Sequence, residues 1–183
     1  MPEIATMNIE ERLKSVIRDV KDFPKPGIIF KDITPILLDP ALCLEVTDEL
    51  YRKFLKQRVE AIVGVESRGF LFGMMLAQKF KVPFVPVRKK GKLPYETVSH
   101  SYDLEYGSAT IEMHSDAIKR GHHVLIHDDL LATGGTAGAT AELIQKQGGV
   151  VAGFSFLIEL GFLNGRDHLK KYTGEINSLV KYH

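Results

Sequence analysis

The chain has 183 residues, of which 44% are hydrophobic and 26% charged. This length is enough for one sizeable hydrophobic core and too short for two typical domains. Its 24 basic and 23 acidic residues nearly cancel, so neither nucleic acid nor an anionic membrane is expected as the main partner. The single cysteine, Cys43, excludes an intramolecular disulfide and any CxxC-type zinc site. With no apolar run near the roughly 18 residues of a membrane span, we expect one cytoplasmic domain over residues 1–183.

The first part of the chain predicts two helices separated by a proline-rich loop. Apolar residues recur at helical spacing over residues 8–22, and Asn8 fits the N-cap position. The segment that follows has several prolines, yet it is too apolar for an exposed linker, so residues 23–38 are expected to form a loop that covers something. Asp39 and Pro40 then predict the start of a second helix that reaches about Lys56.

From Glu60 onward, strands and helices alternate. Strands are predicted over residues 60–65, 82–88, 123–129 and 150–160, with helices over residues 69–80 and 135–147. The strands are continuous apolar runs, which favours an α/β fold with a parallel twisted sheet flanked by helices. Residues 89–112 interrupt this pattern and predict a long flexible loop followed by a two-stranded excursion. Loops of this length in a compact domain are often lids or binding loops. The last residues, 172–183, predict an edge strand.

The stretch HVLIHDDLLATGGTAGATAELI, residues 123–144, carries the most chemical information. Ligands of open parallel sheets bind beyond the carboxyl ends of the strands, where Asp128 and Asp129 are expected, and carboxylates can accept hydrogen bonds from a sugar diol. The glycine loop that follows, Ala132–Thr136, offers free amides and hydroxyls at a helix N-terminus, which suits a phosphate monoester. The alternative is that Asp129 or Thr133 only caps the helix.

Two other phosphate motifs can be tested by inspection. GVESRG, residues 64–69, has the spacing of a P-loop, but Phe70 and Leu71 stand where Lys and Ser or Thr would be needed. No GxGxxG follows a strand, which counts against a dinucleotide-binding dehydrogenase. The ESRG turn still lies where a second anion could bind, and the alternative is that Gly69 is a turn residue and Glu66 and Arg68 form a surface ion pair.

A basic segment, residues 88–93, follows the next strand. It carries Arg88, Lys89, Lys90 and Lys92 at a position where another strand is expected to end. Such runs are usually solvated surfaces, and only the position at a strand end favours an anion site here.

The histidines do not indicate a metal site. His123 and His127 share one face of the same predicted strand, but four residues separate them by roughly 13 Å, too far to share an ion. Structural or surface roles are therefore expected for both.

These motifs together resemble the type I phosphoribosyltransferases, because VLIHDDLLATGGT closely matches the phosphoribosyl pyrophosphate (PRPP) motif of that fold. The segments FPKPGIIFKDITPIL, ESRGFLFG, VRKKGKLP, SYDLEYG and FLIEL narrow the resemblance to the adenine phosphoribosyltransferases. The matches run from about Phe23 to Arg166. They depart from the family at His127, where an aliphatic residue is usual, and at Lys31, where some relatives have arginine.

The resemblance implies a homodimeric purine salvage enzyme that converts adenine and PRPP to AMP and pyrophosphate with Mg²⁺. It assigns Asp128 and Asp129 to the ribose hydroxyls, with one of them as a possible magnesium ligand. The 5-phosphate would be held by Ala132, Thr133, Gly134, Gly135 and Thr136, and the pyrophosphate by Ser67, Arg68, Gly69, Arg88, Lys89 and Lys92.

For the base, the resemblance implies that Phe30 stacks on adenine while the backbone of Ile29 and Lys31 reads its edge. Glu105 would be the acid/base residue, on a mobile hood that includes Tyr106. Taken without the family, Glu105 is more simply a surface acid in a hairpin. Two alternatives stay open: an enzyme for a 6-oxopurine, which the apolar GIIF loop disfavours, and a non-catalytic PRPP sensor, which would need a DNA-binding segment.

Overall fold

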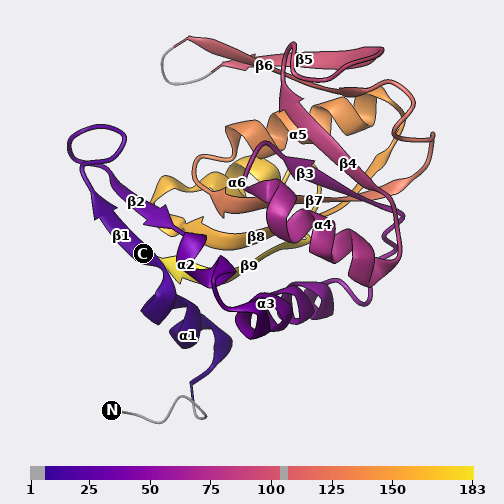
Figure 1. Ribbon diagram of the computed structural model, residues 1–183. Helices are drawn as coiled ribbons and strands as arrows, with labels where there is room; N and C mark the ends of the chain where they lie inside the picture. The colour runs from indigo at the N-terminus through magenta and orange to yellow at the C-terminus, as the bar shows by residue number, and fades with distance from the viewer. Residues whose placement is uncertain (1–6, 104–106) are drawn as a thin grey trace. The chain divides into compact units, whose positions relative to one another are not determined.

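The computed structural model describes residues 7–103 and 107–183 (Figure 1). The chain divides into two compact units, Met1–Glu49 and Leu50–His183, and each is described by itself. The single domain expected over residues 1–183 stays a prediction. Within the described residues, no helix is long and apolar enough to cross a membrane.

The first unit begins with α1 (Ile9–Val16), and Asn8 caps it as predicted. The Asn8 side chain accepts from the Glu11 amide, and the Glu11 carboxylate accepts from the Asn8 amide, which forms a capping box. The predicted extension of this helix to Asp22 is wrong. After Val16 the chain becomes extended, because β1 (Arg18–Lys21) pairs with a strand that comes later in the sequence.

The apolar segment over residues 23–38 is more regular than the predicted loop. It contains β2 (Ile29–Asp32), which is antiparallel to β1, and the short α2 (Thr34–Leu37). The turn between β1 and β2 is closed by the Asp22 carboxylate, which accepts from the Gly27 amide at 2.7 Å. The second predicted helix is confirmed as α3 (Pro40–Lys53), with Asp39 accepting from the Leu42 amide at 3.0 Å.

The second unit is built on one seven-stranded sheet in the order β5-β6-β4-β3-β7-β8-β9. Its strands are β3 (Ala61–Val65), β4 (Phe84–Lys89), β5 (Thr97–Asp103), β6 (Ser108–His114), β7 (His123–Leu131), β8 (Val150–Leu160) and β9 (Ile176–Tyr182). The five strands from β4 to β9 in this order are parallel, which confirms the predicted sheet. The predicted excursion is the antiparallel hairpin β5-β6, and the predicted edge strand is β9.

Helices cover both faces of this sheet (Figure 1). α4 (Gly69–Phe80) packs on the face that carries His127, since a Cβ at Gly73 would lie 3.6 Å from that ring. α5 (Gly135–Lys146) packs on the other face, where its Ala137 and Leu143 join the core around Ile126. A 3-10 helix (Gly161–Leu163) and the short α6 (Gly165–Leu169) follow β8.

The register of the parallel strands brings the predicted site residues to one edge. Val65 of β3 lies opposite Val87 of β4, and Gly64 lies opposite His127 of β7. Because the strands run in the same direction, three features lie toward the carboxyl ends of neighbouring strands: the ESRG turn after β3, the basic segment that begins in the last two residues of β4, and the Asp128–Asp129 pair near the end of β7. This is the edge at which open parallel sheets bind ligands.

Candidate active site

The acidic pair at the end of β7 is stabilised by an arginine from the neighbouring turn. Asp129 is only 4% exposed, and its Oδ2 accepts a short hydrogen bond from Arg68 Nε. Asp128 is partly buried, and its Oδ1 accepts from the Asp129 amide at 2.8 Å. Burial, and then the adjacent Asp129 carboxylate, raise the pKa of Asp128 well above its usual range. Arg68 offsets only part of the repulsion between the two acids, and the remainder contributes to the raised pKa of Asp128.

The ESRG turn lies between β3 and α4, as the sequence predicted. Its glycine is needed for close packing, because a Cβ at Gly69 would lie 2.8 Å from the His127 carbonyl oxygen and 3.0 Å from Asp128 Oδ1. The α4 N-terminus therefore lies directly against the acidic pair. The surface ion pair considered between Glu66 and Arg68 is not the arrangement found, since Arg68 pairs with Asp129 and Glu66 pairs with Arg88.

The glycine loop turns directly into α5. Gly134 is the N-cap with φ +83°, a conformation that favours glycine, and α5 begins at Gly135. The first amides of a helix have no partner within it, so this loop presents donors and positive potential at the edge of the sheet. Thr133 is exposed, and the Thr136 hydroxyl lies 3.0 Å from the Tyr102 hydroxyl of β5. The loop can accept an anion such as a phosphate monoester.

A second glycine, missed in the sequence, supports the glycine loop from behind. A Cβ at Gly165 would lie 2.1 Å from the Ala132 carbonyl oxygen and 3.0 Å from the Gly134 amide nitrogen. In the reverse direction, a Cβ at Gly134 would lie 2.8 Å from the Gly165 carbonyl oxygen. The two backbones touch, so neither residue can carry a side chain without moving the other. The only signal in the sequence is the Asn-Gly pair at residues 164 and 165, which also fits an ordinary turn.

The basic segment is held by two carboxylates that sequence reasoning did not place there. Glu66 Oε2 accepts from Arg88 Nε at 3.1 Å and from the Lys89 amide at 3.0 Å. Glu112 Oε1, from β6, accepts from the Lys92 and Leu93 amides, each at 3.0 Å. Burial alone would raise the pKa of Glu112, but backbone hydrogen bonds from residues 91–93 lower it below its usual value.

These contacts separate the roles of the basic side chains. The Arg88 guanidinium bonds to Glu66 and, at 3.1 Å, to the Lys92 carbonyl oxygen, so it shapes the basic segment. Lys89 and Lys92 have exposed side chains that extend from a fixed backbone. The basic segment can therefore present two lysines to an anion, while Arg88 is already engaged within the protein.

The predicted base-binding residues belong to the first unit. Phe30, on β2, packs edge-on against Phe23 with ring centroids 5.2 Å apart. Lys31 Nζ donates to Asp19 Oδ1 at 2.7 Å, so its side chain is engaged within the β1-β2 hairpin, and Ile29 is exposed. The predicted hood residues Glu105 and Tyr106 lie outside the described residues.

His127 is a buried core residue. Its Nδ1 lies 3.1 Å from the Ser155 hydroxyl, and burial lowers its pKa to about 3. Across residues 7–103 and 107–183, no group of three or more His, Cys, Asp or Glu side chains could hold a metal ion. The structural role expected for His127 fits this environment.

Comparison with known proteins identifies the family. Residues 35–176 match the phosphoribosyl transferase domain. The adenine phosphoribosyltransferase of Cytophaga hutchinsonii is 53% identical over 174 residues, which are 95% of this chain and 96% of that protein. The adenine phosphoribosyltransferase structure from Thermoanaerobacter pseudethanolicus matches with a TM-score of 0.92 and 48% identity, and the match covers 96% of this chain and all of that one.

A further solved relative carries ligands. The Saccharomyces cerevisiae adenine phosphoribosyltransferase, complexed with D-2,5-dideoxy-2,5-imino-altritol 1,6-bisphosphate and adenine, matches with a TM-score of 0.85 and 40% identity, covering 93% of this chain and 98% of that one. The match with these proteins extends over the acidic pair, the glycine loop and the basic segment. The chain therefore belongs to the adenine phosphoribosyltransferases of the phosphoribosyl transferase family.

Proposed function

We propose that this chain transfers the phosphoribosyl group of PRPP to adenine, with AMP and pyrophosphate as products. The observation that carries the proposal is the acidic pair near the end of β7, which is followed after two residues by the glycine loop at the N-terminus of α5. Carboxylates for a sugar diol and amides for a phosphate lie in one short stretch, which suits a ribose 5-phosphate group. The adenine and bisphosphate in the yeast relative support both halves of the substrate pair.

We assign the binding of PRPP to residues of the second unit. Asp128 and Asp129 accept hydrogen bonds from the ribose hydroxyls, and the glycine loop, Ala132–Thr136, binds the 5-phosphate. Ser67, Arg68 and Gly69 bind pyrophosphate together with Lys89 and Lys92, while Arg88 acts through the shape of the basic segment. The exposure of Ser67, Lys89 and Lys92 supports this assignment, because these side chains are available to an anion.

We assign the binding of adenine to residues of the first unit and of the hood. Phe30 stacks on adenine, and the backbone of Ile29 and Lys31 reads its hydrogen-bonding edge. The Lys31 contact with Asp19 supports a backbone role for this residue, because it engages the side chain elsewhere. The same contact explains why Lys can stand where some relatives have Arg. Glu105 is the acid/base residue of the hood, which includes Tyr106.

The proposed chemistry is a displacement at C1 of the ribose. The bond from C1 to the pyrophosphate oxygen breaks as the bond from C1 to adenine N9 forms, and the N9 proton passes to the Glu105 carboxylate. The transition state resembles an oxocarbenium ion, so the enzyme must stabilise the leaving charge, position the base and exclude water. Lysines and backbone amides at the edge of the sheet serve the first requirement, and the base-binding hairpin serves the second.

Magnesium fits the site as a companion of the substrate. The acidic pair offers at most two carboxylates, one of which is paired with Arg68. Mg²⁺ is commonly held by one or two carboxylates together with substrate phosphates and water, which matches this donor set. When bound, the ion would neutralise charge on the pyrophosphate, and Asp128 or Asp129 would be its protein ligand.

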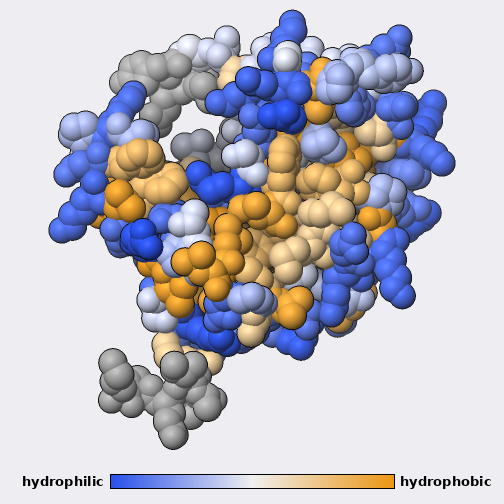
Figure 2. All heavy atoms as spheres, in the orientation of Figure 1, coloured by the Kyte–Doolittle hydropathy of each residue, from blue (hydrophilic) through white to orange (hydrophobic). Residues whose placement is uncertain are grey.

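A homodimer and a cytoplasmic location are parts of the same proposal. Apolar side chains gather over α4 (Figure 2), where Leu71 is 41% and Met74 46% exposed. An exposed apolar helix face is commonly covered by a partner subunit. Light scattering after gel filtration is expected to give about twice the 20.5 kDa chain mass, and the chain mass alone would contradict the dimer. The single cysteine supports the location.

The deciding experiment is an initial-rate assay with PRPP and Mg²⁺. Adenine, hypoxanthine, guanine and xanthine are offered separately, and nucleotide and pyrophosphate are both monitored. AMP from adenine alone is expected. Nucleotide from a 6-oxopurine would instead support the related salvage enzymes, and PRPP binding without any nucleotide would support the non-catalytic sensor.

A variant of the hood tests the assigned acid/base residue. Glu105→Gln is expected to lower kcat by roughly 10²–10⁴-fold, the usual contribution of a positioned acid/base group. If chemistry limits turnover and kcat stays near the wild-type value, Glu105 has no such role.

A further inference from the structure

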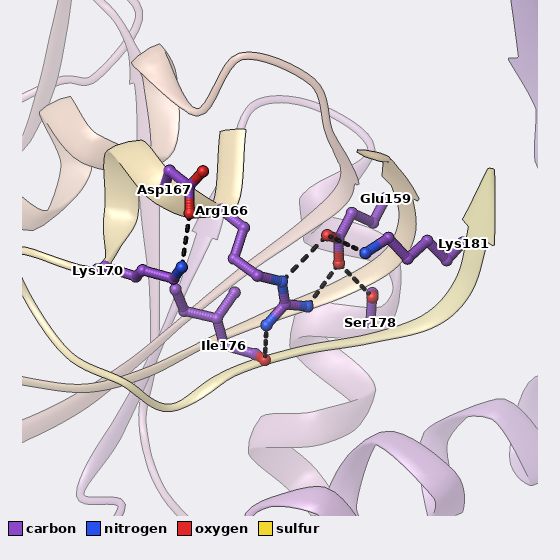
Figure 3. Close-up of polar contacts among 7 residues, drawn as sticks. All are labelled: Glu159, Arg166, Asp167, Lys170, Ile176, Ser178 and Lys181. Atoms are coloured by element: carbon purple, nitrogen blue, oxygen red, sulfur yellow. Dashed lines mark hydrogen bonds and ion pairs between the residues drawn. The ribbon is translucent and has the colours of Figure 1, made fainter. Parts of the chain in front are cut away.

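A buried ion-pair cluster lies at the end of β8, outside the residues assigned to substrate (Figure 3). Glu159 is 2% exposed and is surrounded by partners from two elements. Its Oε1 accepts from Arg166 Nε at 3.0 Å, and its Oε2 accepts from Arg166 Nη2 at 2.5 Å and from the Ser178 hydroxyl at 2.7 Å. Lys181 Nζ lies 3.6 Å from Oε1. Burial would raise the pKa of Glu159, yet these partners lower it to about 2, so the carboxylate is charged at neutral pH.

The cluster fixes α6 to the sheet. Arg166 lies in the first turn of α6, and besides its two bonds to Glu159 it donates from Nη1 to the Ile176 carbonyl oxygen of β9 at 2.6 Å. Two strands therefore hold one guanidinium, and a planar guanidinium held at three points has little freedom to move. This side chain ties the first turn of α6 to β8 and β9, and the buried Leu169 anchors the end of the helix in the core.

The residue next to Arg166 is Gly165, which contacts the glycine loop. A Cβ at Gly165 would lie 2.1 Å from the Ala132 carbonyl oxygen, so a small displacement of α6 would push directly on the loop. A short path thus leads from the buried ion pair through the Arg166–Gly165 peptide bond, and then through a non-bonded contact, to the backbone that is assigned the 5-phosphate.

We propose that Glu159 and Arg166 are positioning residues for the glycine loop, which they hold in shape by fixing Gly165 against Ala132 and Gly134. The inference rests on the proposed function, because it assumes that this loop binds the 5-phosphate. It assigns to the FLIEL segment and to β9 a role in substrate affinity, although neither touches the substrate in the proposed arrangement.

The nature of the cluster favours this role over simple stabilisation. A buried ion pair often contributes no more stability than apolar residues of the same volume, because both charges lose their hydration. What it provides is a defined geometry. The same helix carries a contrasting pair, Asp167 and Lys170, whose side chains are 68% and 62% exposed and contact each other at 2.6 Å (Figure 3). That exposed pair contributes little and fixes nothing in the site.

The test compares Glu159→Gln with the control Asp167→Asn from the same helix. Each variant replaces a carboxylate by an amide of the same shape. For Glu159→Gln we expect a rise of about tenfold or more in the KM for PRPP, as for other small displacements of a binding group, with the KM for adenine unchanged. Ribose 5-phosphate binding measured by calorimetry is expected to weaken by a similar factor, while pyrophosphate binding stays within twofold. Asp167→Asn is expected to match the wild type in all three measurements.

The outcomes separate this inference from the proposed function. If the wild-type protein neither binds PRPP nor forms AMP, the proposed function is wrong. If the wild type is active and a folded Glu159→Gln variant has unchanged affinity for PRPP and ribose 5-phosphate, the positioning role is wrong. If Glu159→Gln does not fold, Ser178→Ala decides, because it removes one hydrogen bond and leaves the ion pair. It is then expected to raise the KM for PRPP at least twofold, and an unchanged KM would overturn the inference.

Discussion

The glycine loop and the basic segment leave the same edge of the sheet, but different forces hold them. The glycine loop is fixed by direct backbone contact with Gly165, where there is no space for a side chain. The basic segment is fixed by carboxylates, with Glu66 and Glu112 accepting from its backbone and from Arg88. The glycine loop is thus in direct packing contact with Gly165, which the Glu159–Arg166 pair is proposed to fix from behind, whereas carboxylates contact the basic segment itself.

The proposed reaction gives a reason for the difference. The 5-phosphate is present in both PRPP and AMP and does not change during the reaction, so a rigid socket can bind it throughout. The pyrophosphate begins as part of the substrate and leaves with more negative charge, so its binding residues must respond to charge. Changes in the contact between Gly165 and the glycine loop should therefore affect the 5-phosphate, and changes in the carboxylates that hold the basic segment should affect the pyrophosphate.

The largest expected effect is on the pH dependence of stability. It comes from the burial of His127 in β7, the strand that leads into the glycine loop. Burial lowers the pKa of His127 from 6.5 to about 3. Above pH 6.5 the His127 ring is neutral in both the folded and the unfolded state. Between pH 6.5 and about pH 3, the ring is protonated in the unfolded chain but stays neutral in the folded protein. Stability should therefore fall as the pH falls through this window, by about 1.4 kcal/mol for each pH unit, or a few kcal/mol in total.

Urea unfolding between pH 7 and 4 checks this contribution. The double variant His127→Val with Ser155→Ala removes the imidazole and its hydroxyl partner together. The pH dependence of its free energy of unfolding gives the number of protons taken up on unfolding. We expect that number to be about one lower than for the wild type. An identical pH dependence would show that His127 is not responsible.

The next largest effect is expected at the contact behind the glycine loop. Gly165→Ala places a methyl group where the Ala132 carbonyl oxygen would be 2.1 Å away, so the loop must move. We expect kcat/KM for PRPP to fall by about 10²-fold, since displacements of about 1 Å in binding groups have effects of this size. Gly174→Ala is the matched control in steady-state kinetics, because its Cβ would meet nothing within 4 Å. Equal activities for the two variants would refute the packing account.

A smaller effect is expected in the basic segment, whose backbone is held by carboxylates. Glu112→Gln leaves one neutral acceptor for the Lys92 and Leu93 amides. Loss of a charged acceptor is expected to weaken pyrophosphate inhibition by about tenfold, which corresponds to about 1.4 kcal/mol and lies near the usual range for such bonds. The exposed Glu96→Gln is the control in the inhibition assay, and a similar change in both variants would point to net charge alone.

The smallest effect is expected where the hairpin meets the glycine loop. Tyr102→Phe removes only the 3.0 Å contact with the Thr136 hydroxyl and keeps the ring against Gly135. A single neutral hydrogen bond contributes about 0.5–1.5 kcal/mol, so a rise of roughly threefold in the KM for PRPP is expected. A change larger than about tenfold would mean that Tyr102 contacts the substrate itself.

The sequence predicted the elements whose cause is local. α4 was predicted at the residues where it occurs because the glycine at its start and the apolar run after it are adjacent in the chain. β1 was predicted as helix because its pairing partner, β2, comes later and contributes hydrogen bonds that helical spacing does not reveal. The antiparallel placement of β6 beside the end of β4 was likewise invisible in a run of polar residues.

The same distinction applies to the site. Asp128, Asp129 and the glycine loop lie within nine consecutive residues, so the chemistry of this one stretch is enough to suggest what they bind. Gly165 and Glu112 act through contacts with residues about 20 to 30 positions away, and each has a simpler local interpretation, as a turn glycine or a strand acid. Residues that position other residues are identified only when the chain is folded.

One calorimetric experiment tests whether the two halves of the site are held independently, the glycine loop through its contact with Gly165 and the basic segment through Glu66 and Glu112. AMP and pyrophosphate are titrated separately into the wild type, Gly165→Ala and Glu112→Gln. The account predicts that Gly165→Ala loses affinity for AMP and keeps it for pyrophosphate, while Glu112→Gln loses affinity for pyrophosphate and keeps it for AMP. If both variants lose affinity for both ligands to the same extent, the two halves are not held independently and the account is contradicted.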